Sequence, residues 1–155
     1  MGQAERSDLL ERYRAGAHVV EEALQGITAD ELDRRPPGAW SPRMVIHHLA
    51  DSEANSYIRL RKLLAEEDTT LQGYDEAHWA VVLHYDRPVD ASLAVFRGVR
   101  ASSSELLDRL TEEDWARGGF HTESGPYSVT DWLRIYAAHG HDHAEQIRRA
   151  RRGEA

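Results

Sequence analysis

The chain has 155 residues, of which 41% are hydrophobic and 30% charged, a mixture typical of a globular domain rather than of a disordered segment. Its 27 acidic and 19 basic side chains give a formal net charge of -8, which argues against a broad nucleic-acid-binding surface. The absence of cysteine excludes disulfides, thiolate metal ligands and a cysteine nucleophile, so nitrogen and oxygen must hold any metal. We predict one domain over residues 1–155.

The first predicted helix spans about residues 8–25. Its apolar side chains recur every three or four residues and form one stripe: Leu10, Tyr13, Ala17, Val20 and Leu24. Gly26 is typical of a helix stop. Thr28 and Glu31 have capping-box spacing and predict one short turn, before residues 36–38 (PPG) break the chain.

A second helix is predicted over about residues 41–66. Ser41 is a good N-cap, and Pro42 suits the first helical position, where no amide hydrogen is needed. The residues on its inner side are Val45, His48, Leu49, Ser52, Ser56, Leu60, Leu63 and Leu64. A loop through Gly73 follows, and then a short helix over about residues 74–83.

The third long helix is predicted over about residues 90–110. Its stripe consists of Leu93, Phe96, Val99, Ser103, Leu106 and Leu110. Thr111 resembles another N-cap, so we expect a turn around Trp115. The glycines and proline of residues 118–126 predict a long loop.

Ser128 opens the fourth predicted helix with capping spacing. Its inner stripe is Val129, Trp132, Leu133, Tyr136, His139, His143 and Ile147. Gly140 and Ala144 on this helix predict a small-residue surface that allows a neighbouring helix to approach closely. Period-two alternation is scarce throughout, so we predict an all-α four-helix bundle with a long crossover between the second and third helices.

The nine histidines include three that point inward in this scheme. His139 and His143 lie four residues apart, so both imidazoles face the same way and can chelate one metal ion. His48 lies on the apolar side of the second helix, and the three rings can converge. His141 is predicted to point to the opposite, solvated face, and His47 to lie on the flank.

A competing interpretation is that each inward histidine is a hydrogen-bonded core residue. Three buried imidazoles without a shared partner would be costly, however, because each has a donor and an acceptor to satisfy. Three protein ligands leave an open coordination position, which is typical of a catalytic site. The other histidines are predicted to be surface or structural residues: His18, His78, His84 and His121.

Carboxylates near the three histidines in sequence could orient their rings: Asp51, Glu53, Asp142 and Glu145. The simpler interpretation is that most of them are solvated charges on helix faces. No apolar run is long enough to span a bilayer and no apolar signal segment opens the sequence, so we expect a cytoplasmic protein without a membrane partner.

The sequence resembles the DinB/YfiT-like family of metalloenzymes. The resemblance rests on residues 40–53 (WSPRMVIHHLADSE) and 131–147, which contain DWL followed by the two spaced histidines. Residues 74–79 and 110–115 also fit the family pattern, so the match covers nearly the whole chain. It implies an up-down-down-up bundle with a divalent metal, zinc or nickel among the candidates, held at His48, His139 and His143.

The resemblance leaves three functions open. The first is an enzyme that transfers a metal-activated low-molecular-weight thiol onto a small electrophile, and the second is a metal-dependent hydrolase. The third is a non-catalytic helical binding module whose histidines are structural. Candidate walls of the substrate mouth are Trp40, Tyr74, Trp79 and Trp115. The family also implies a homodimer.

Overall fold

A computed structural model describes residues 1–155 and contains seven helices and three short strands. The long helices are α1 (Gln3–Leu24), α3 (Pro42–Ala65), α5 (Asp90–Leu107) and α7 (Val129–Arg152). The short helices are α2 (Ala29–Leu32), α4 (Glu76–Val82) and α6 (Glu112–Ala116). The strands are β1 (Thr70–Leu71), β2 (Gly118–His121) and β3 (Gly125–Ser128).

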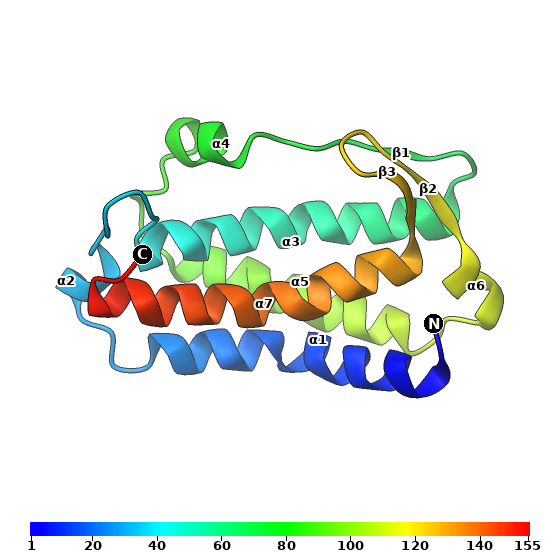
Figure 1. The fold of residues 1–155 in the computed structure, drawn as a ribbon, viewed down its shortest axis with the longest axis horizontal. Coiled ribbons are helices and arrows are strands. Elements are labelled where there is room, and N and C mark those ends of the chain that lie inside the picture. The colour runs from blue at the N-terminus through cyan, green and yellow to red at the C-terminus, as the bar shows by residue number, and fades with distance from the viewer.

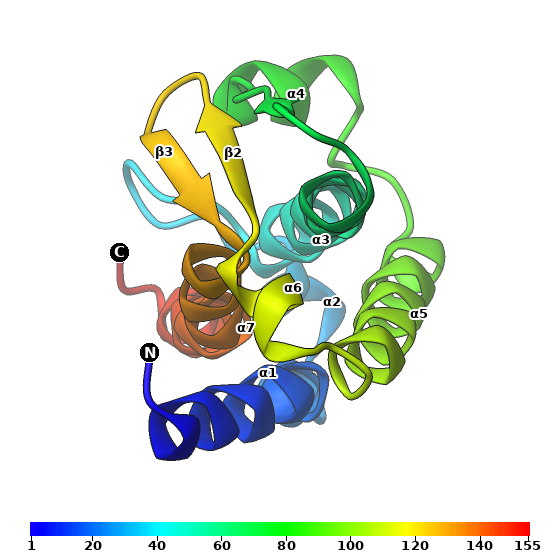
Figure 2. The same cartoon turned by 90° about the vertical axis from the view of Figure 1, so that its right-hand side faces the viewer.

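The four long helices form an up-down-down-up bundle, which confirms the predicted fold. Figure 1 shows α1 and α7 running in one direction and α3 and α5 in the other. Seen end-on in Figure 2, the helices stand at the corners of a square, in the order α1, α5, α3, α7. Because α3 and α5 are parallel, residues 66–89 must return along the outside of the bundle, and this crossover carries β1 and α4.

Side-chain caps start the helices where the sequence predicted them. The Ser41 side chain accepts a hydrogen bond from the Met44 amide at the start of α3, with proline at the first helical position. Thr28, Thr111 and Ser128 each form a complete capping box, at the starts of α2, α6 and α7. The caps at Ser41 and Ser128 therefore fix where α3 and α7, the two helices that carry the inward histidines, begin.

The core consists of two apolar clusters along the bundle. One contains Trp132, Leu133 and Tyr136 of α7 packed against Tyr13, Leu60 and Leu63. The other contains Val20, Val45, Leu49, Phe96, Ala144 and Ile147. None of the helices combines the length and apolar composition needed to cross a membrane.

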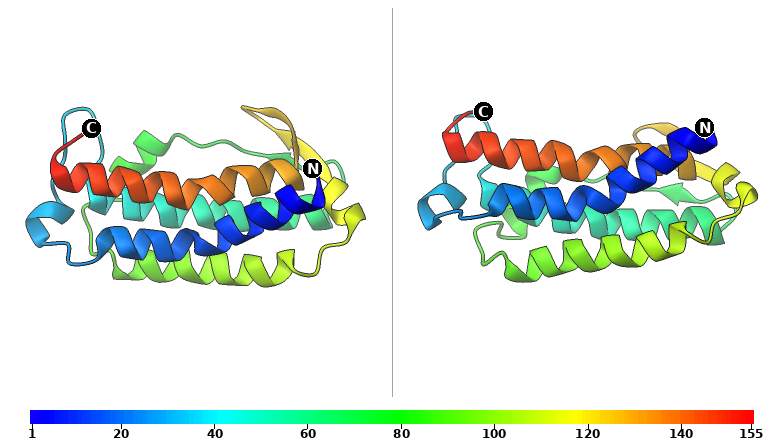
Figure 3. Two further views of the ribbon diagram at one scale, coloured as in Figure 1. Left: turned by 60° about the horizontal axis from the view of Figure 1, so that its bottom comes forward. Right: turned by 90° about the horizontal axis from the view of Figure 1, so that it is seen from below.

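The prediction of a loop over residues 118–126 is wrong, because this segment forms a β-hairpin. Strands β2 and β3 pair in antiparallel fashion, and β1 from the crossover joins β2 in parallel. Figure 3 shows the hairpin at the end of the bundle where α7 begins. A side chain at Gly119 would collide with the main chain of Thr69, so the glycine is what allows β2 to approach β1. The sheet ties the crossover to the start of α7.

The inner face of the third helix also differs from its prediction. The helix ends at Leu107, three residues early, and Val99 and Leu106 are only partly buried. Arg100 lies in the core instead, with 2% of its surface exposed. A positively charged side chain such as that of Arg100 is rarely buried without a partner, so it requires an oppositely charged or hydrogen-bonding group inside the bundle.

Candidate metal centre

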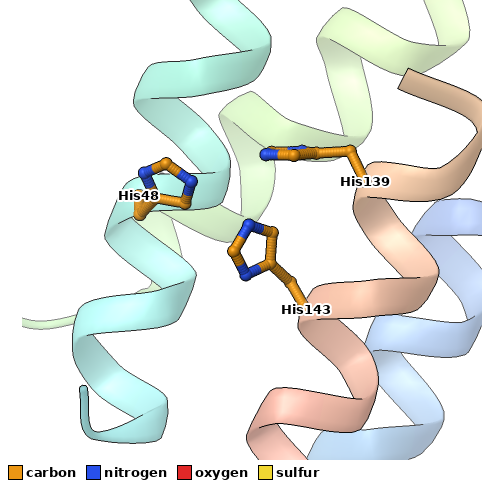
Figure 4. Close-up of side chains that lie close together, drawn as sticks. All are labelled: His48, His139 and His143. Carbon is orange, nitrogen blue, oxygen red and sulfur yellow. The ribbon is translucent and has the colours of Figure 1, made fainter. Parts of the chain in front are cut away.

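Three imidazoles from two helices converge inside the bundle. His48 lies on the second turn of α3, and His139 and His143 lie one turn apart on α7. Figure 4 shows the three rings pointing toward one another across the gap between α3 and α7. Each ring offers one nitrogen, and these three atoms lie within 4.8 Å of one another. The helical facing predicted from the sequence therefore brings these rings to one point.

The rings lie at contact distance in a desolvated environment. Ring centroids are 4.8 Å apart for His48 and His143 and 4.5 Å for His139 and His143. Burial lowers the pKa of His48 to about 3, with further contributions from the two neighbouring histidines. Burial also lowers the pKa of His143 to about 4. Both rings are therefore neutral at pH 7 and present lone pairs to a cation.

The hydrogen bonds of the rings fit a shared metal ion. Nδ1 of His143 donates to the Gln146 side-chain oxygen at 2.7 Å, which leaves Nε2 as its lone-pair nitrogen. Nδ1 of His48 and Nδ1 of His139 are buried and have no hydrogen-bond partner. Since buried nitrogens are normally satisfied, three converging imidazoles, two of them with an unsatisfied nitrogen, fit a divalent cation better than an apolar core.

The carboxylate of Glu53 lies beside this cluster. It is one of the four carboxylates that could orient the rings, most of which were expected to be solvated, and the structure shows Glu53 fully buried. Its Oε1 atom is 2.7 Å from Arg100 and 3.7 Å from Nδ1 of His139. Helical spacing marks both partners: Arg100 stands four residues after Phe96 on one apolar stripe, and Glu53 stands four residues after Leu49 on the other.

The remaining histidines lie outside the cluster. His47, predicted to lie on the flank of its helix, is fully buried there, with Nδ1 2.8 Å from the Ser92 hydroxyl and Nε2 3.0 Å from the Arg87 carbonyl. His141 points away from the centre and bonds the Arg12 carbonyl at 2.9 Å. Of the four predicted to be surface or structural, three are exposed: His18, His78 and His84. His121 is buried, and its Nδ1 accepts the Glu123 amide.

Three of the four aromatic candidates lie near the histidines. The Trp40 ring packs edge-on against His48, with 5.1 Å between centroids. The rings of Tyr74 and Trp79 in the crossover contact each other at a tilt of 40°, with 4.3 Å between centroids. Trp115 does not reach the site, because it is buried in the core cluster of Tyr13 and Trp132 at the α6 end of the bundle. The prediction that Trp115 lines the mouth is therefore wrong.

The crossover also supplies polar groups next to the cluster. The Tyr74 hydroxyl is buried without a hydrogen-bond partner, and burial raises its pKa to about 12 while the neighbouring Ser52 hydroxyl opposes that shift. Ser52 Oγ lies 3.4 Å from Nε2 of His139. Burial raises the pKa of the Glu76 carboxyl, and His139 opposes that shift. Tyr74 therefore lies beside Ser52, on the side of α3 that faces His139.

A cavity of about 390 Å³ lies between α3 and the crossover. Trp79 and Ile58 form part of its apolar wall, and Arg59 and Lys62 supply positive charge. Arg59 also donates to the hydroxyl of Tyr136 at 3.2 Å, and the Tyr136 ring lies 5.7 Å from the His139 ring. None of the three histidines lines this cavity, and Arg59 connects it to His139 through the Tyr136 side chain.

Comparison with known proteins points to one family. A sequence model of the DinB superfamily matches residues 12–147. A protein from Oceanobacillus iheyensis named "Putative metal-dependent hydrolase" is 40% identical over 110 residues, which are 71% of this chain and 64% of that protein. The match thus spans less than two thirds of that relative's length. A Bacillus cereus protein with the same name is 33% identical over 131 residues, which are 84% of this chain and 76% of the relative.

A solved structure shows the same architecture. The structure of YfiT from Bacillus subtilis, described as "a probable metal-dependent hydrolase with an unusual four-helix bundle topology", aligns with a TM-score of 0.91 at 28% identity. The alignment covers 100% of this chain and 91% of that protein. The agreement over the full length includes the crossover and the hairpin as well as the four long helices.

Proposed function

The chain belongs to the DinB superfamily, and from that premise we propose that it is a metal-dependent hydrolase whose divalent ion is held by His48, His139 and His143. The observation that carries the proposal is the convergence of three imidazole nitrogens within 4.8 Å of one another. The relatives named as metal-dependent hydrolases support the choice of reaction. Nitrogen-only ligation favours zinc or nickel over magnesium or calcium.

The chemistry follows from what each group can do. His48, His139 and His143 would hold the divalent ion, which would supply Lewis-acid activation of a water molecule when bound. The buried, unpartnered hydroxyl of Tyr74 can donate to an oxygen that gains negative charge during hydrolysis. Burial raises the pKa of the Glu76 carboxyl, a shift in the direction that suits a group that takes up a proton during the reaction.

The substrate site we propose is the cavity beside the cluster. Its volume of about 390 Å³ suits a small molecule. Arg59 and Lys62 favour an anionic or carbonyl-rich group, and Trp79 with Ile58 favours an apolar portion. The carboxylate of Asp51, which also lines the cavity, already accepts the Tyr85 hydroxyl at 2.6 Å. The proposed substrate is therefore a small amphipathic ester or amide.

The thiol transferase expected from the sequence stays a prediction, since nothing in the site or the relatives' names points to a thiol. The homodimer likewise stays a prediction. Hydrolysis and thiol transfer would use the same three histidines, so an activity assay has to distinguish the two reactions. Hydrolysis proceeds without added thiol, whereas thiol transfer depends on it.

The test combines metal analysis with activity. Purified protein is expected to bind one zinc or nickel ion per chain and to hydrolyse members of a panel of small esters and amides without thiol. His139→Ala removes one ligand and is expected to abolish both properties. The matched control is His141→Ala, on the same helix two residues from each ligand, where both properties are retained.

Two outcomes contradict the proposal in different ways. Stoichiometric metal together with activity that appears only when a small thiol is added replaces hydrolysis by thiol transfer. No bound metal in the wild-type protein, and no thermal shift on adding zinc or nickel, favours the binding module with structural histidines.

A further inference from the structure

The guanidinium of Arg100 joins all four long helices in the middle of the bundle. From α5, its Nε and Nη2 atoms donate to Oε1 of Glu53 on α3, at 3.0 and 2.7 Å. Nη1 donates to the Tyr13 carbonyl of α1 at 2.5 Å, and Nη2 also donates to the Tyr136 carbonyl of α7 at 2.7 Å. The side chains of Arg100 and Glu53 are 2% and 0% exposed.

Stability alone is a poor explanation for this ion pair. Removing two charges from water costs several kcal/mol per ion, and apolar residues of similar volume often serve a core equally well or better. Glu53 nevertheless occupies the core, five residues after His48 and beside His139. Two bonds from Arg100 and a contact of 3.3 Å between its Oε2 and the Ser56 hydroxyl fix the orientation of its carboxylate.

The fixed carboxylate faces a nitrogen that lacks a partner. Nδ1 of His139 is buried, has no hydrogen bond, and lies 3.7 Å from Oε1 of Glu53. An ionised carboxylate only accepts hydrogen bonds, so it favours a proton on Nδ1. With the proton there, the lone pair of the ring lies on Nε2, the nitrogen next to Ser52.

We propose that Glu53, held in place by Arg100, is a positioning residue that keeps the Nδ1 proton on His139 and presents Nε2 to the metal. The inference rests on the proposed metal site and adds the device that orients one of its ligands. Carboxylates that orient a ligating histidine in this way commonly raise metal affinity about 10- to 100-fold.

The first test needs no metal. Nitrogen NMR of ¹⁵N-histidine-labelled, metal-free protein distinguishes protonated from unprotonated ring nitrogens. The inference expects His139 to carry its proton on Nδ1 in the wild type. Replacing the pair with apolar residues, Glu53→Leu with Arg100→Met, is expected to shift the proton toward Nε2. A wild-type His139 with its proton on Nε2 overturns the inference.

The second test measures metal affinity directly. Cobalt or zinc titration is expected to show about 10- to 100-fold weaker binding for the Glu53→Leu/Arg100→Met protein, which keeps the core apolar and avoids an unpaired buried charge. The matched control is Glu145→Gln, which removes an exposed carboxylate two residues from His143 and leaves the affinity unchanged. A folded double variant with wild-type affinity overturns the inference.

The two proposals fail in distinguishable ways. A wild-type protein that binds cobalt or zinc, with no loss in the double variant, overturns the role of Glu53 and leaves the metal site standing. A wild-type protein that binds neither metal overturns both. If the double variant does not fold, the tautomer of His139 in the wild type still decides whether Glu53 sets the position of its proton.

Discussion

Gly140 on α7 packs directly against the backbone of Gly16 on α1. A β-carbon added at Gly140 would lie 3.0 Å from the carbonyl oxygen and 3.1 Å from the α-carbon of Gly16. The contact lies next to His139, and α1 and α7 form the most extensive helix pair of the bundle. The close approach predicted from Gly140 and Ala144 thus helps to fix the position of the helix that carries two of the three histidines.

Gly140→Ala is expected to destabilise the protein. Alanine gains about 1 kcal/mol in helix propensity, but the added methyl group meets helix backbone that cannot rotate away, and overpacking typically costs about 1–3 kcal/mol. We expect a net loss of about 1 kcal/mol in the free energy of unfolding, measured by urea denaturation.

The control for this prediction is Gly98→Ala in α5. A β-carbon at Gly98 would meet nothing within 4 Å, so only the propensity gain applies. We expect the free energy of unfolding to rise by up to about 1 kcal/mol. Equal stabilisation by both substitutions would show that the interface between α1 and α7 can open without cost.

The features that depend on local sequence, namely the helix starts and the direction in which side chains face, could be predicted from the sequence. Caps at Ser41 and Ser128 set where α3 and α7 begin, and helical periodicity then placed His48, His139 and His143 on inner faces. The direction of the four helices came from the family resemblance, because periodicity does not fix topology.

Features that depend on tertiary contacts were missed. The strands of residues 118–128 lack period-two apolar alternation and form because β1 and β2 meet across the crossover, with Gly119 allowing the approach. Glu53 could be named only as one of four candidate carboxylates, because its partner, Arg100, is 47 residues away in the sequence. A buried ion pair can be predicted only once the two helices are known to face each other.

Metal-free protein is expected to lose stability as the pH falls from about 6.5 towards 4. Burial holds the pKa of His48 at about 3 and that of His143 at about 4, below the value of about 6.5 for unfolded histidine. Between these values the unfolded chain binds protons that the folded chain does not, so acidification favours unfolding. Each ring contributes a slope of up to about 1.4 kcal/mol per pH unit.

This pH dependence is measured by denaturation with a chelator present. His143→Gln removes one of the two rings and is expected to flatten the slope above pH 5, where few carboxylates titrate. His18→Gln, at an exposed position outside the cluster, serves as the control for the substitution. A wild-type curve that stays flat from pH 6.5 to 5 would contradict the burial of neutral imidazoles.

Adding metal at neutral pH is expected to stabilise the bundle. Zinc at 100 times its dissociation constant adds about 2.7 kcal/mol, which corresponds to a rise in Tm of roughly 5–10 °C for a domain of this size. Scanning calorimetry should show the rise in the wild type and in His141→Ala. It should be absent in His48→Ala and His139→Ala, and a full shift in either variant would mean that zinc binds elsewhere.

Substitutions of two tryptophans should distinguish a side chain that only stabilises the core from one that supports the metal centre. Trp115 is 6% exposed in the core cluster, so Trp115→Ala is expected to cost about 3–5 kcal/mol of stability while the zinc affinity of the folded protein stays unchanged. Trp40 is only partly buried but packs edge-on against His48, so Trp40→Ala is expected to cost less stability and to weaken zinc binding. Urea denaturation and zinc titration of both variants at low temperature check the contrast. Weaker zinc binding in the Trp115 variant alone would mean that the α6 end of the bundle, and not the Trp40 contact, holds the His48 ring in position.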